Sequence, residues 1–518
     1  MTRSSNIRLR SLLMIGSALT LAACDGAKNI SSPGDGAIVV PPPAPAPAPA
    51  PTPTPTPTPT GPAADCPTGT ANVGVINSLR NCSLSGTITG ALTLRNIRGV
   101  VYSLNGRVNV GVDLGADPGA PAAGGSQGIL TVEPGVVVFG SSGADALVIN
   151  RGSQIFAEGT ATRPIIFTSR SNMEGGVNAS SIGQWGGIVL LGRAPIHTCV
   201  GEGIPGTVNC QSAVEGLTGA FYGGGSPSDN SGRMQFVQVR YPGFEVSPGN
   251  ELNGITFAGV GSGTFAQNIQ VHNSSDDGIE WFGGRLNHKF LVVTGADDDS
   301  LDTDLGYKGL MQYVLVVQRS DGGDHVIEAD TRGGELKTPR SNPRIANFTF
   351  IHRRTRPQAN ILRGGTDYGL ANGIISSSGT TPCLLIEGNQ TAVTTANGAT
   401  DEVGAPIFRS VIFGCATAVA TAAAPAVSVA DTTPLITGNN NLLPPVTLTL
   451  TDIFLPGSFE TAAVATNPRT AFTGTGTFFD ETTFVGAFRN AADTWYAGWT
   501  CGIGTGATAC TAAPSPIQ

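Results

Sequence analysis

Short β-forming runs recur along this chain, mostly 22 to 25 residues apart with one longer coil, and no other feature restricts its fold as strongly. Each run leads into a turn and then a second short β run. The starting residues of successive runs are 22, 23, 34 and 25 positions apart. The runs are Asn268–Val271, Phe290–Val293, Tyr313–Val316, Asn347–Phe350 and Asn372–Ile375. Such internal repetition is typical of architectures in which similar structural units stack on one another.

A period of about 22 residues predicts an all-β fold, the right-handed parallel β-helix. One coil of that length cannot bury its apolar side chains alone, whereas stacked coils share a continuous core. A β-propeller needs about 40 residues per blade, and leucine-rich repeats need a Leu and Asn signature that the sequence lacks. We expect the β-helix over residues 126–420, an N-terminal cap over 63–125 and an irregular β region that caps the other end over 421–518.

The composition excludes other classes of protein. Gly accounts for 71 of the 518 residues, and only 13% of the residues are charged, unlike the Glu-, Lys- and Leu-rich composition of coiled coils. The 37 acidic residues outnumber the 29 basic residues and give a net charge of -8. We expect no nucleic acid as partner, because such binding depends on basic surfaces.

The N-terminal residues have the pattern of an export signal. Basic residues come first, and an apolar run too short to span a bilayer follows them. This run ends in Leu21-Ala22-Ala23-Cys24, which resembles the lipobox of bacterial lipoproteins. The resemblance implies a signal peptide over residues 1–23, acylation of Cys24 and membrane anchoring through the lipid. We therefore expect a lipid-anchored protein of the bacterial cell envelope, in the outer membrane.

A proline-rich linker over residues 24–62 separates this anchor from the repeats. Ala-Pro and Thr-Pro alternate from Pro41 to Pro62. Proline at this density favours polyproline II and cannot form a packed core. We expect a disordered, semi-rigid spacer that holds the folded part away from the membrane.

Eight cysteines remain besides Cys24, and an even number in an exported chain favours disulfide bonds. Eight cysteines allow 105 connectivities, but their spacing favours pairs of sequence neighbours that close local loops. These pairs are Cys66 with Cys82, Cys199 with Cys210, Cys383 with Cys415, and Cys501 with Cys510. The sequence has no Cys or His spacing typical of a zinc site.

The negative charge of the chain is concentrated in one segment. Between Asp276 and Asp330 there are twelve Asp and Glu residues and four Lys and Arg residues, a difference of -8. Aligned repeats place several of these carboxylates in columns, where equivalent residues lie roughly 4.8 Å apart. We expect one column of Asp277, Asp299 and Asp324 and a second of Glu280, Asp302 and Glu328.

Three interpretations of these acidic columns remain open. Ca²⁺ takes six to eight oxygen ligands, which stacked carboxylates and turn carbonyls supply. Paired carboxylates also perform glycoside hydrolysis, and a lyase would combine bound Ca²⁺ with a basic residue such as Lys308 or Arg332. The third interpretation is structural, because Asp in a turn accepts hydrogen bonds from the backbone.

A basic segment follows the acidic one. Seven Lys and Arg residues, with Arg332, Arg353 and Arg354 among them, stand against one Glu between residues 331 and 356. Such residues either neutralise the acidic columns or form a site for an anionic ligand, a uronate or a lipid phosphate. The sequence leaves both readings open.

Three sequence motifs resemble a family of uncharacterised exported bacterial β-helix proteins. They are Trp185–Gly192, Asp276–Gly284 and the run Asp297–Asp302, together with the ending Trp495–Trp499. Members of this family are often lipoproteins and are often encoded near TonB-dependent receptors, which implies such a receptor as a partner. The coils are also similar, more distantly, to pectin-lyase-like proteins.

These features predict a cell-envelope lipoprotein that acts by binding. Its β-helix would present a long face to a polymeric ligand, a glycan, or to an outer-membrane partner, with Ca²⁺ as a cofactor. The alternative is an enzyme, a polysaccharide lyase or a glycoside hydrolase that acts on acidic glycans.

Overall fold

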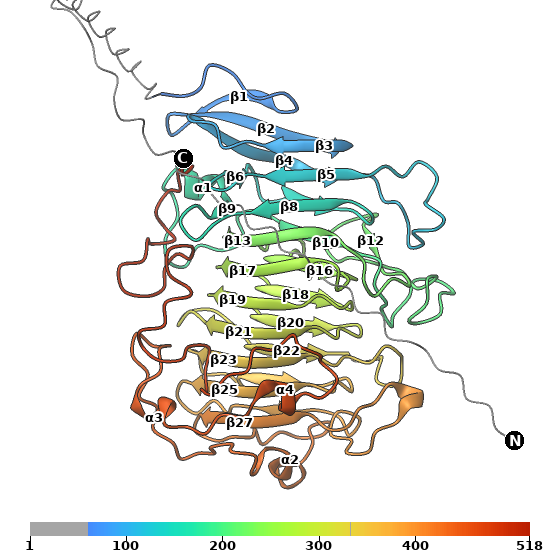
Figure 1. The fold of residues 1–518 in the computed structure, drawn as a ribbon, viewed down its shortest axis with the longest axis vertical. Helices are drawn as coiled ribbons and strands as arrows, with labels where there is room; N and C mark the ends of the chain where they lie inside the picture. The colour runs from blue at the N-terminus through green and yellow to red at the C-terminus, as the bar shows by residue number, and fades with distance from the viewer. Residues whose placement is uncertain (1–60, 332) are drawn as a thin grey trace, which may run out of the picture. The chain divides into compact units, whose positions relative to one another are not determined.

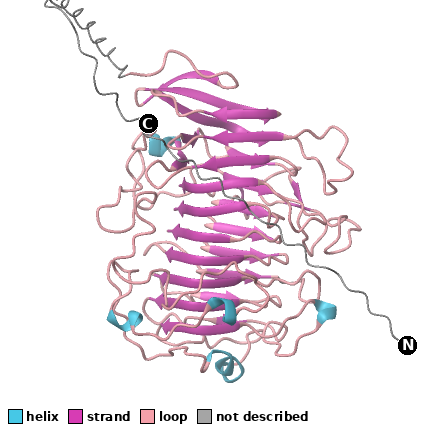
Figure 2. Cartoon of the chain, in the orientation of Figure 1, coloured by secondary structure: helices cyan, strands magenta, loops and turns pink. Residues whose placement is uncertain are grey.

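The computed structural model of the chain describes residues 61–331 and 333–518, so Cys24, the linker up to residue 60 and Arg332 lie outside the described residues. Most of the described strands stack in parallel, and the helical segments lie only at the periphery (Figures 1 and 2). This arrangement confirms the predicted right-handed parallel β-helix. No helix of these residues has the length and apolar character needed to cross a membrane.

The strands form three parallel ladders. The first ladder starts with β2 (Leu79–Ile88), β4 (Val100–Val110), β6 (Val137–Gly140) and β9 (Ile165–Ser169). The third starts with β3 (Gly90–Leu94), β5 (Gly128–Val132) and β8 (Gln154–Glu158). The second ladder contains β7 (Ala146–Ile149), β10 (Gly187–Leu191), β16 (Ile255–Ala258), β18 (Ile279–Phe282), β20 (Leu301–Asp304), β22 (Ile327–Asp330), β24 (Asn360–Leu362) and β26 (Leu385–Ile386).

Seven long strands bend in the middle and belong to both the third and the first ladder. They are β13 (Gly232–Arg240), β17 (Phe265–His272), β19 (His288–Thr294), β21 (Leu310–Val317), β23 (Arg344–His352), β25 (Gly369–Ser377) and β27 (Ile407–Gly414). One residue at each bend has a left-handed backbone, with φ between 50° and 62°: Phe236, Asn268, Phe290, Tyr313, Asn347, Asn372 and Ser410. Asn tolerates this conformation better than most residues. Each predicted β run therefore begins at a bend.

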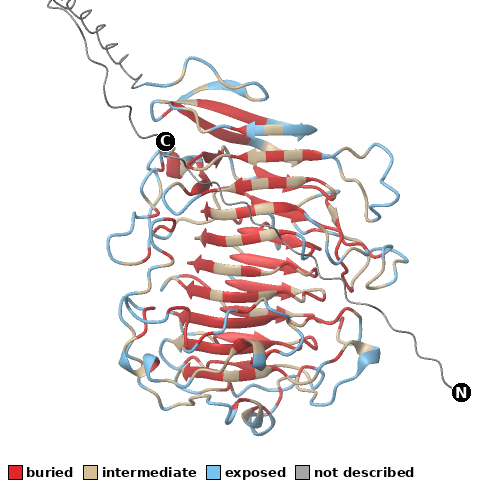
Figure 3. Cartoon of the chain, in the orientation of Figure 1, coloured by how far each residue is buried: buried red, intermediate tan, exposed pale blue. Residues whose placement is uncertain are grey.

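Most residues of the stacked strands are buried (Figure 3). Apolar side chains from all three ladders form one core between them. Phe257, Trp281 and Tyr307 stack on successive coils, with ring centroids 6.1 and 5.4 Å apart. The Trp281 indole donates a hydrogen bond to His288 Nε2 over 2.9 Å, and the Tyr307 hydroxyl donates to the Leu286 carbonyl. Because these polar atoms have hydrogen-bond partners, their burial costs little free energy.

The parallel pairing begins earlier in the chain than residue 126. β2, β3 and β4 already pair with later strands in register, so the segment expected to form only a cap contributes coils. The edge itself is covered by β1 (Ala71–Ile76), which runs antiparallel to β2. Two small hairpins complete the strands: β11 (Ser212–Ala213) with β12 (Phe221–Tyr222), and β14 (Glu245–Ser247) with β15 (Asn250–Glu251).

The C-terminal residues do more than cap the last coil. Residues around α2 (Val429–Ile436) cover β27. The chain continues through α3 (Ser458–Thr461) and α4 (Pro468–Ala471) and returns along the first ladder (Figure 1). Side chains of successive coils bond its backbone, among them Asn347 to Phe484, Gln270 to Cys501 and Asn172 to Cys510. α1 (Arg170–Met173) lies beside the final residues.

All four predicted disulfide bonds are confirmed: Cys66–Cys82, Cys199–Cys210, Cys383–Cys415 and Cys501–Cys510. Each one joins sequence neighbours across 9 to 32 residues. Cys501–Cys510 ties together part of the returning C-terminal segment, and Cys199–Cys210 lies in the loop between β10 and β13. Local closure of this kind stabilises irregular segments that lack a ladder of their own.

We predict that Asn347→Ala lowers the free energy of unfolding by about 3 kcal/mol, because alanine disfavours the left-handed bend and removes buried hydrogen bonds. Asn347 accepts from Gln312 and Thr482 and donates to the Phe484 carbonyl. Denaturant unfolding measures the loss. Asn347→Gly keeps the bend accessible and should lose less; equal losses for both variants would show that the backbone conformation contributes nothing.

Candidate functional site

One outward-facing column of the second ladder is acidic. Glu280 pairs in register with Asp302, and Asp302 with Glu328. Their neighbours Ile279, Trp281 and Leu301 belong to the core, and because side chains alternate along a strand, the acidic residues point away from it. Successive coils thus place three carboxylates side by side, roughly 4.8 Å apart.

Asp277 joins the two upper carboxylates from the turn that precedes β18. Carboxylate oxygens of Asp277, Glu280 and Asp302 lie within 4.8 Å of one another. The three residues are only 7%, 6% and 9% exposed. Within the described chain none of them forms an ion pair, and Asp302 Oδ1 has no hydrogen-bond partner. We call these three residues the acidic triad.

Burial raises the pKa of all three triad carboxyls well above the ordinary value, and the neighbouring carboxylates raise it further. The same two causes raise the pKa of Asp276 to about 8 and that of Asp298 to about 6. Burial also raises the pKa of Asp304 to about 7, although the Leu305 amide opposes this shift. A concentration of buried carboxylates without cations requires protons or a bound metal ion.

The loop between β10 and β13 covers the outer face of the second ladder and buries part of this region. Ile196, Cys210 and Tyr222 of this loop pack with Val189 and Phe282 in one apolar cluster. The rings of Tyr222 and Phe282 lie 5.8 Å apart. No periodic signal in the sequence indicates this cover, because the loop interrupts the repeat.

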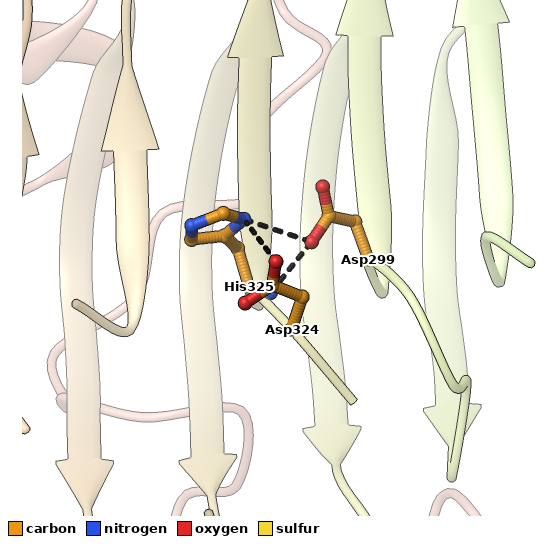
Figure 4. Close-up of side chains that lie close together, drawn as sticks. All are labelled: Asp299, Asp324 and His325. Atoms are coloured by element: carbon orange, nitrogen blue, oxygen red, sulfur yellow. Dashed lines mark hydrogen bonds and ion pairs between the residues drawn. The ribbon is translucent and has the colours of Figure 1, made fainter. Parts of the chain in front are cut away.

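The carboxylates of Asp299 and Asp324 form a second acidic group, and both lie beside His325 Nδ1 (Figure 4). His325 Nδ1 lies 3.0 Å from Asp299 Oδ1 and 3.9 Å from Asp324 Oδ2, and Gln358 Nε2 lies 2.8 Å from His325 Nε2. Burial lowers the pKa of His325, but the hydrogen bond and charge of Asp299, with the charge of Asp324, raise it above the ordinary value overall. Since both ring nitrogens already have partners, His325 is poorly placed to bind a metal.

The expected column of Asp277, Asp299 and Asp324 is wrong at its third position. The Asp299 amide donates to Asp277 Oδ1 and the His325 amide to Asp299 Oδ1, so His325 follows Asp299 in the stack. Asp324 instead bonds the carbonyl of Asp298 through its backbone amide. Leu301 and Ile327 are in register although 26 residues separate them, and this longer coil shifts the alignment by one residue.

Glu328, the lowest member of the outward column, has a cationic partner that sequence reasoning missed. Arg363 forms ion pairs with Glu328 and with Asp330, the latter over 2.8 Å. Burial and the charge of Asp299 nevertheless raise the pKa of Glu328 to about 8, and Arg363 opposes that shift. In the sequence, Arg363 directly follows the β run Asn360–Leu362. This position in the repeat is the signal that could have identified Arg363 as the partner of Glu328.

The predicted basic residues do not join the triad. Arg353 is exposed and Arg354 half-buried in the loop after β23, and neither forms an ion pair within residues 61–331 and 333–518. Arg356 pairs with Asp324 over 3.3 Å. This ion pair corresponds to the first interpretation of the basic segment, in which its residues neutralise the acidic ones. Lys308 pairs with Asp401.

The triad fits Ca²⁺ best among the acidic groups. Oxygens that share one Ca²⁺ at about 2.4 Å lie no more than about 4.8 Å apart, which matches the spacing of the triad oxygens. The unpartnered Asp302 Oδ1 supplies a free ligand atom. Asp277, Glu280 and Asp302 would hold the ion, whose charge would offset their mutual repulsion.

We predict that Arg363→Met lowers the melting temperature, and more strongly at pH 8 than at pH 5. The raised pKa keeps Glu328 protonated in the folded state at low pH, so the loss of Arg363 leaves the charge of Glu328 without this partner only as the pH rises. Thermal unfolding at both pH values tests this. Arg170→Met breaks an exposed pair with Glu174 and should cost about 0.5 kcal/mol or less at either pH; a pH-independent loss in Arg363→Met would contradict the prediction.

Comparison with known proteins agrees with the architecture. A family model described as a pectate-lyase-like β-helix domain matches residues 120–443. No curated protein and no solved structure matches the chain significantly. The match spans the parallel coils from β5 to β27 and includes the acidic triad. The chain belongs to the pectate-lyase-like β-helix domain family.

Proposed function

We propose that this protein is a lipid-anchored cell-envelope protein whose β-helix binds a glycan polymer, with Ca²⁺ held by Asp277, Glu280 and Asp302. Membership of a pectate-lyase-like family supports a role connected with glycans. The observation that carries the calcium part is the buried triad with its unpartnered Asp302 Oδ1. An outer-membrane receptor of the TonB-dependent class is the proposed protein partner.

Binding explains the site better than hydrolysis does. A glycosidase places its two carboxylates on either side of the sugar bond that breaks. Glu280 and Asp302 are adjacent, at most 9% exposed and crowded by Asp277, so a sugar ring does not fit between them. A cation at this position would instead fix the turns and strands that form the binding face.

We predict that Ca²⁺ raises the melting temperature of the EDTA-treated protein, and does so more at pH 8 than at pH 5. When the pKa of a carboxyl is raised in the folded state, the free energy of unfolding falls as the pH rises through that pKa. The protein without Ca²⁺ should therefore be less stable at pH 8 than at pH 5. Ca²⁺ binds the ionised carboxylates and restores the loss. Scanning calorimetry with EDTA and then with added Ca²⁺ measures both effects.

A matched pair of variants assigns the effect to the triad. Asp302→Asn should abolish the response to Ca²⁺, whereas Asp321→Asn, an exposed carboxylate of the same acidic segment, should retain it. A wild-type protein without a Ca²⁺ response, together with a more stable Asp302→Asn variant, would mean that protons and not a cation neutralise the triad.

We predict that Cys24→Ser moves the protein from the membrane fraction to the soluble fraction of the cell. The lipobox-like motif makes Cys24 the acylated residue, and acyl chains supply the affinity for the membrane. Fractionation and mass spectrometry of the intact N-terminus measure the change. Ser32→Ala alters a neighbouring residue outside the motif and serves as control; unchanged fractionation of Cys24→Ser would contradict lipid anchoring.

A further inference from the structure

A small pocket lies between the first ladder and the C-terminal segment that returns along it. Gln238 and Arg240 line the pocket from β13, and Thr500, Thr508 and Ser515 line it from the returning segment. Its volume is about 170 Å³, well below the roughly 300 Å³ at which pockets take drug-sized ligands. The pocket therefore suits a small ion and not a sugar chain.

The guanidinium of Arg240 lies in this pocket without a carboxylate partner. Arg240 is only 3% exposed, and among the described residues it makes no ion pair with an Asp, a Glu or the C-terminal carboxylate. Its hydrogen bonds go to neutral oxygens: Nε and Nη2 donate to Gln238 Oε1, and Nη1 donates to the Cys510 carbonyl over 3.3 Å. A guanidinium has five N–H donors, so these three hydrogen bonds leave two donors unused.

The surroundings of Arg240 do not neutralise its charge. Burial lowers the pKa of Arg240 to about 10, and the opposing effect comes from Tyr241 and not from a carboxylate, so the side chain stays cationic at pH 7. His272 is in register with Arg240 on the next coil. Burial lowers the pKa of His272 to about 3, and the charges of Arg240 and Arg319 lower it further. A buried charge in such a setting needs a counter-charge.

Other buried arginines of this chain have that counter-charge. Arg151 pairs with Asp113, and Arg340 pairs with Asp367 over 2.7 Å. Both arginine side chains are as deeply buried as Arg240. The lack of a carboxylate at Arg240, in a pocket with room for an ion, is the observation that points to a bound anion.

We propose that this pocket binds an inorganic oxyanion of the phosphate or sulfate type, which Arg240 holds and which fastens the returning C-terminal segment to the first ladder. Guanidinium N–H groups donate paired hydrogen bonds to such anions. Thr508 and Ser515 bring hydroxyl groups to the same pocket from the returning segment, and hydroxyls donate to anionic oxygens. Asn172 and Arg240 already share the Cys510 carbonyl as acceptor, so the anion strengthens an existing junction.

Isothermal titration calorimetry of the full-length protein with phosphate, and separately with sulfate, at constant ionic strength tests the site. We expect one anion per chain. Arg240→Gln should weaken binding at least tenfold, because it removes the charge and the paired donors. Arg233→Gln is the matched control: Arg233 lies on the same strand, its side chain is 43% exposed and it pairs with Glu158, so this variant should bind like the wild type.

Hydrogen exchange tests whether the anion fastens the C-terminal segment. With phosphate at ten times its dissociation constant, exchange of the backbone amides of residues 498–517 should slow about tenfold in the wild type. The same addition should leave exchange in Arg240→Gln unchanged.

Three results would overturn the proposal. A wild type that binds neither phosphate nor sulfate would show that neutral oxygens alone satisfy Arg240, and this result does not depend on whether Arg240→Gln folds. Equal binding by the wild type and Arg240→Gln would place the anion elsewhere. Binding at Arg240 without slower exchange would remove the fastening role.

Discussion

Parallel stacking at a fixed spacing is the constraint on which the rest of this structure depends. Each coil places its side chains directly over the equivalent side chains of the coil before, roughly 4.8 Å away. Apolar columns gain from this repetition, as in the stack of Phe257, Trp281 and Tyr307. Charged columns lose from it, because like charges come equally close. The chain tolerates the acidic columns only with compensation from outside the repeat.

That compensation differs along the acidic column. At its lower end Arg363 neutralises Glu328 and Asp330, and His325 hydrogen-bonds Asp299 in the adjacent turn. At its upper end Asp277, Glu280 and Asp302 have no cationic partner within the described residues. A β-helix built for stability alone would place polar or opposite charges there, as the Arg233–Glu158 pair does between two coils of the third ladder. The uncompensated part of the column is thus the part that most needs a ligand.

Insertions and the C-terminal segment determine which faces of the coils remain accessible. The loop between β10 and β13 covers the acidic side of the second ladder. The returning C-terminal segment covers the first ladder, where Trp499 and Phe488 pack on Val292 and Leu315. The turns around Arg285 and Lys308 retain an open pocket. This pocket and the acidic triad therefore differ in access, since the pocket is open whereas Asp277, Glu280 and Asp302 are at most 9% exposed.

The sequence by itself determined the features that depend on local repetition. The period gave the coils and the bends of the long strands, because the left-handed bend recurs once per coil. Sequence proximity gave the disulfide bonds, and the charge count located the acidic segment. Glu280, Asp302 and Glu328 could be aligned because each is the second residue of its short β run.

Only the tertiary structure decided the features that depend on insertions. The 26-residue step from Leu301 to Ile327 placed His325 rather than Asp324 in register with Asp299. Other segments of the chain supply Arg363, the ion partner of Glu328, and Tyr222, which belongs to the loop that covers the second ladder. The physical reason is that stacking pairs residues by their register in space. The length of every intervening loop changes which residues of the sequence fall into register.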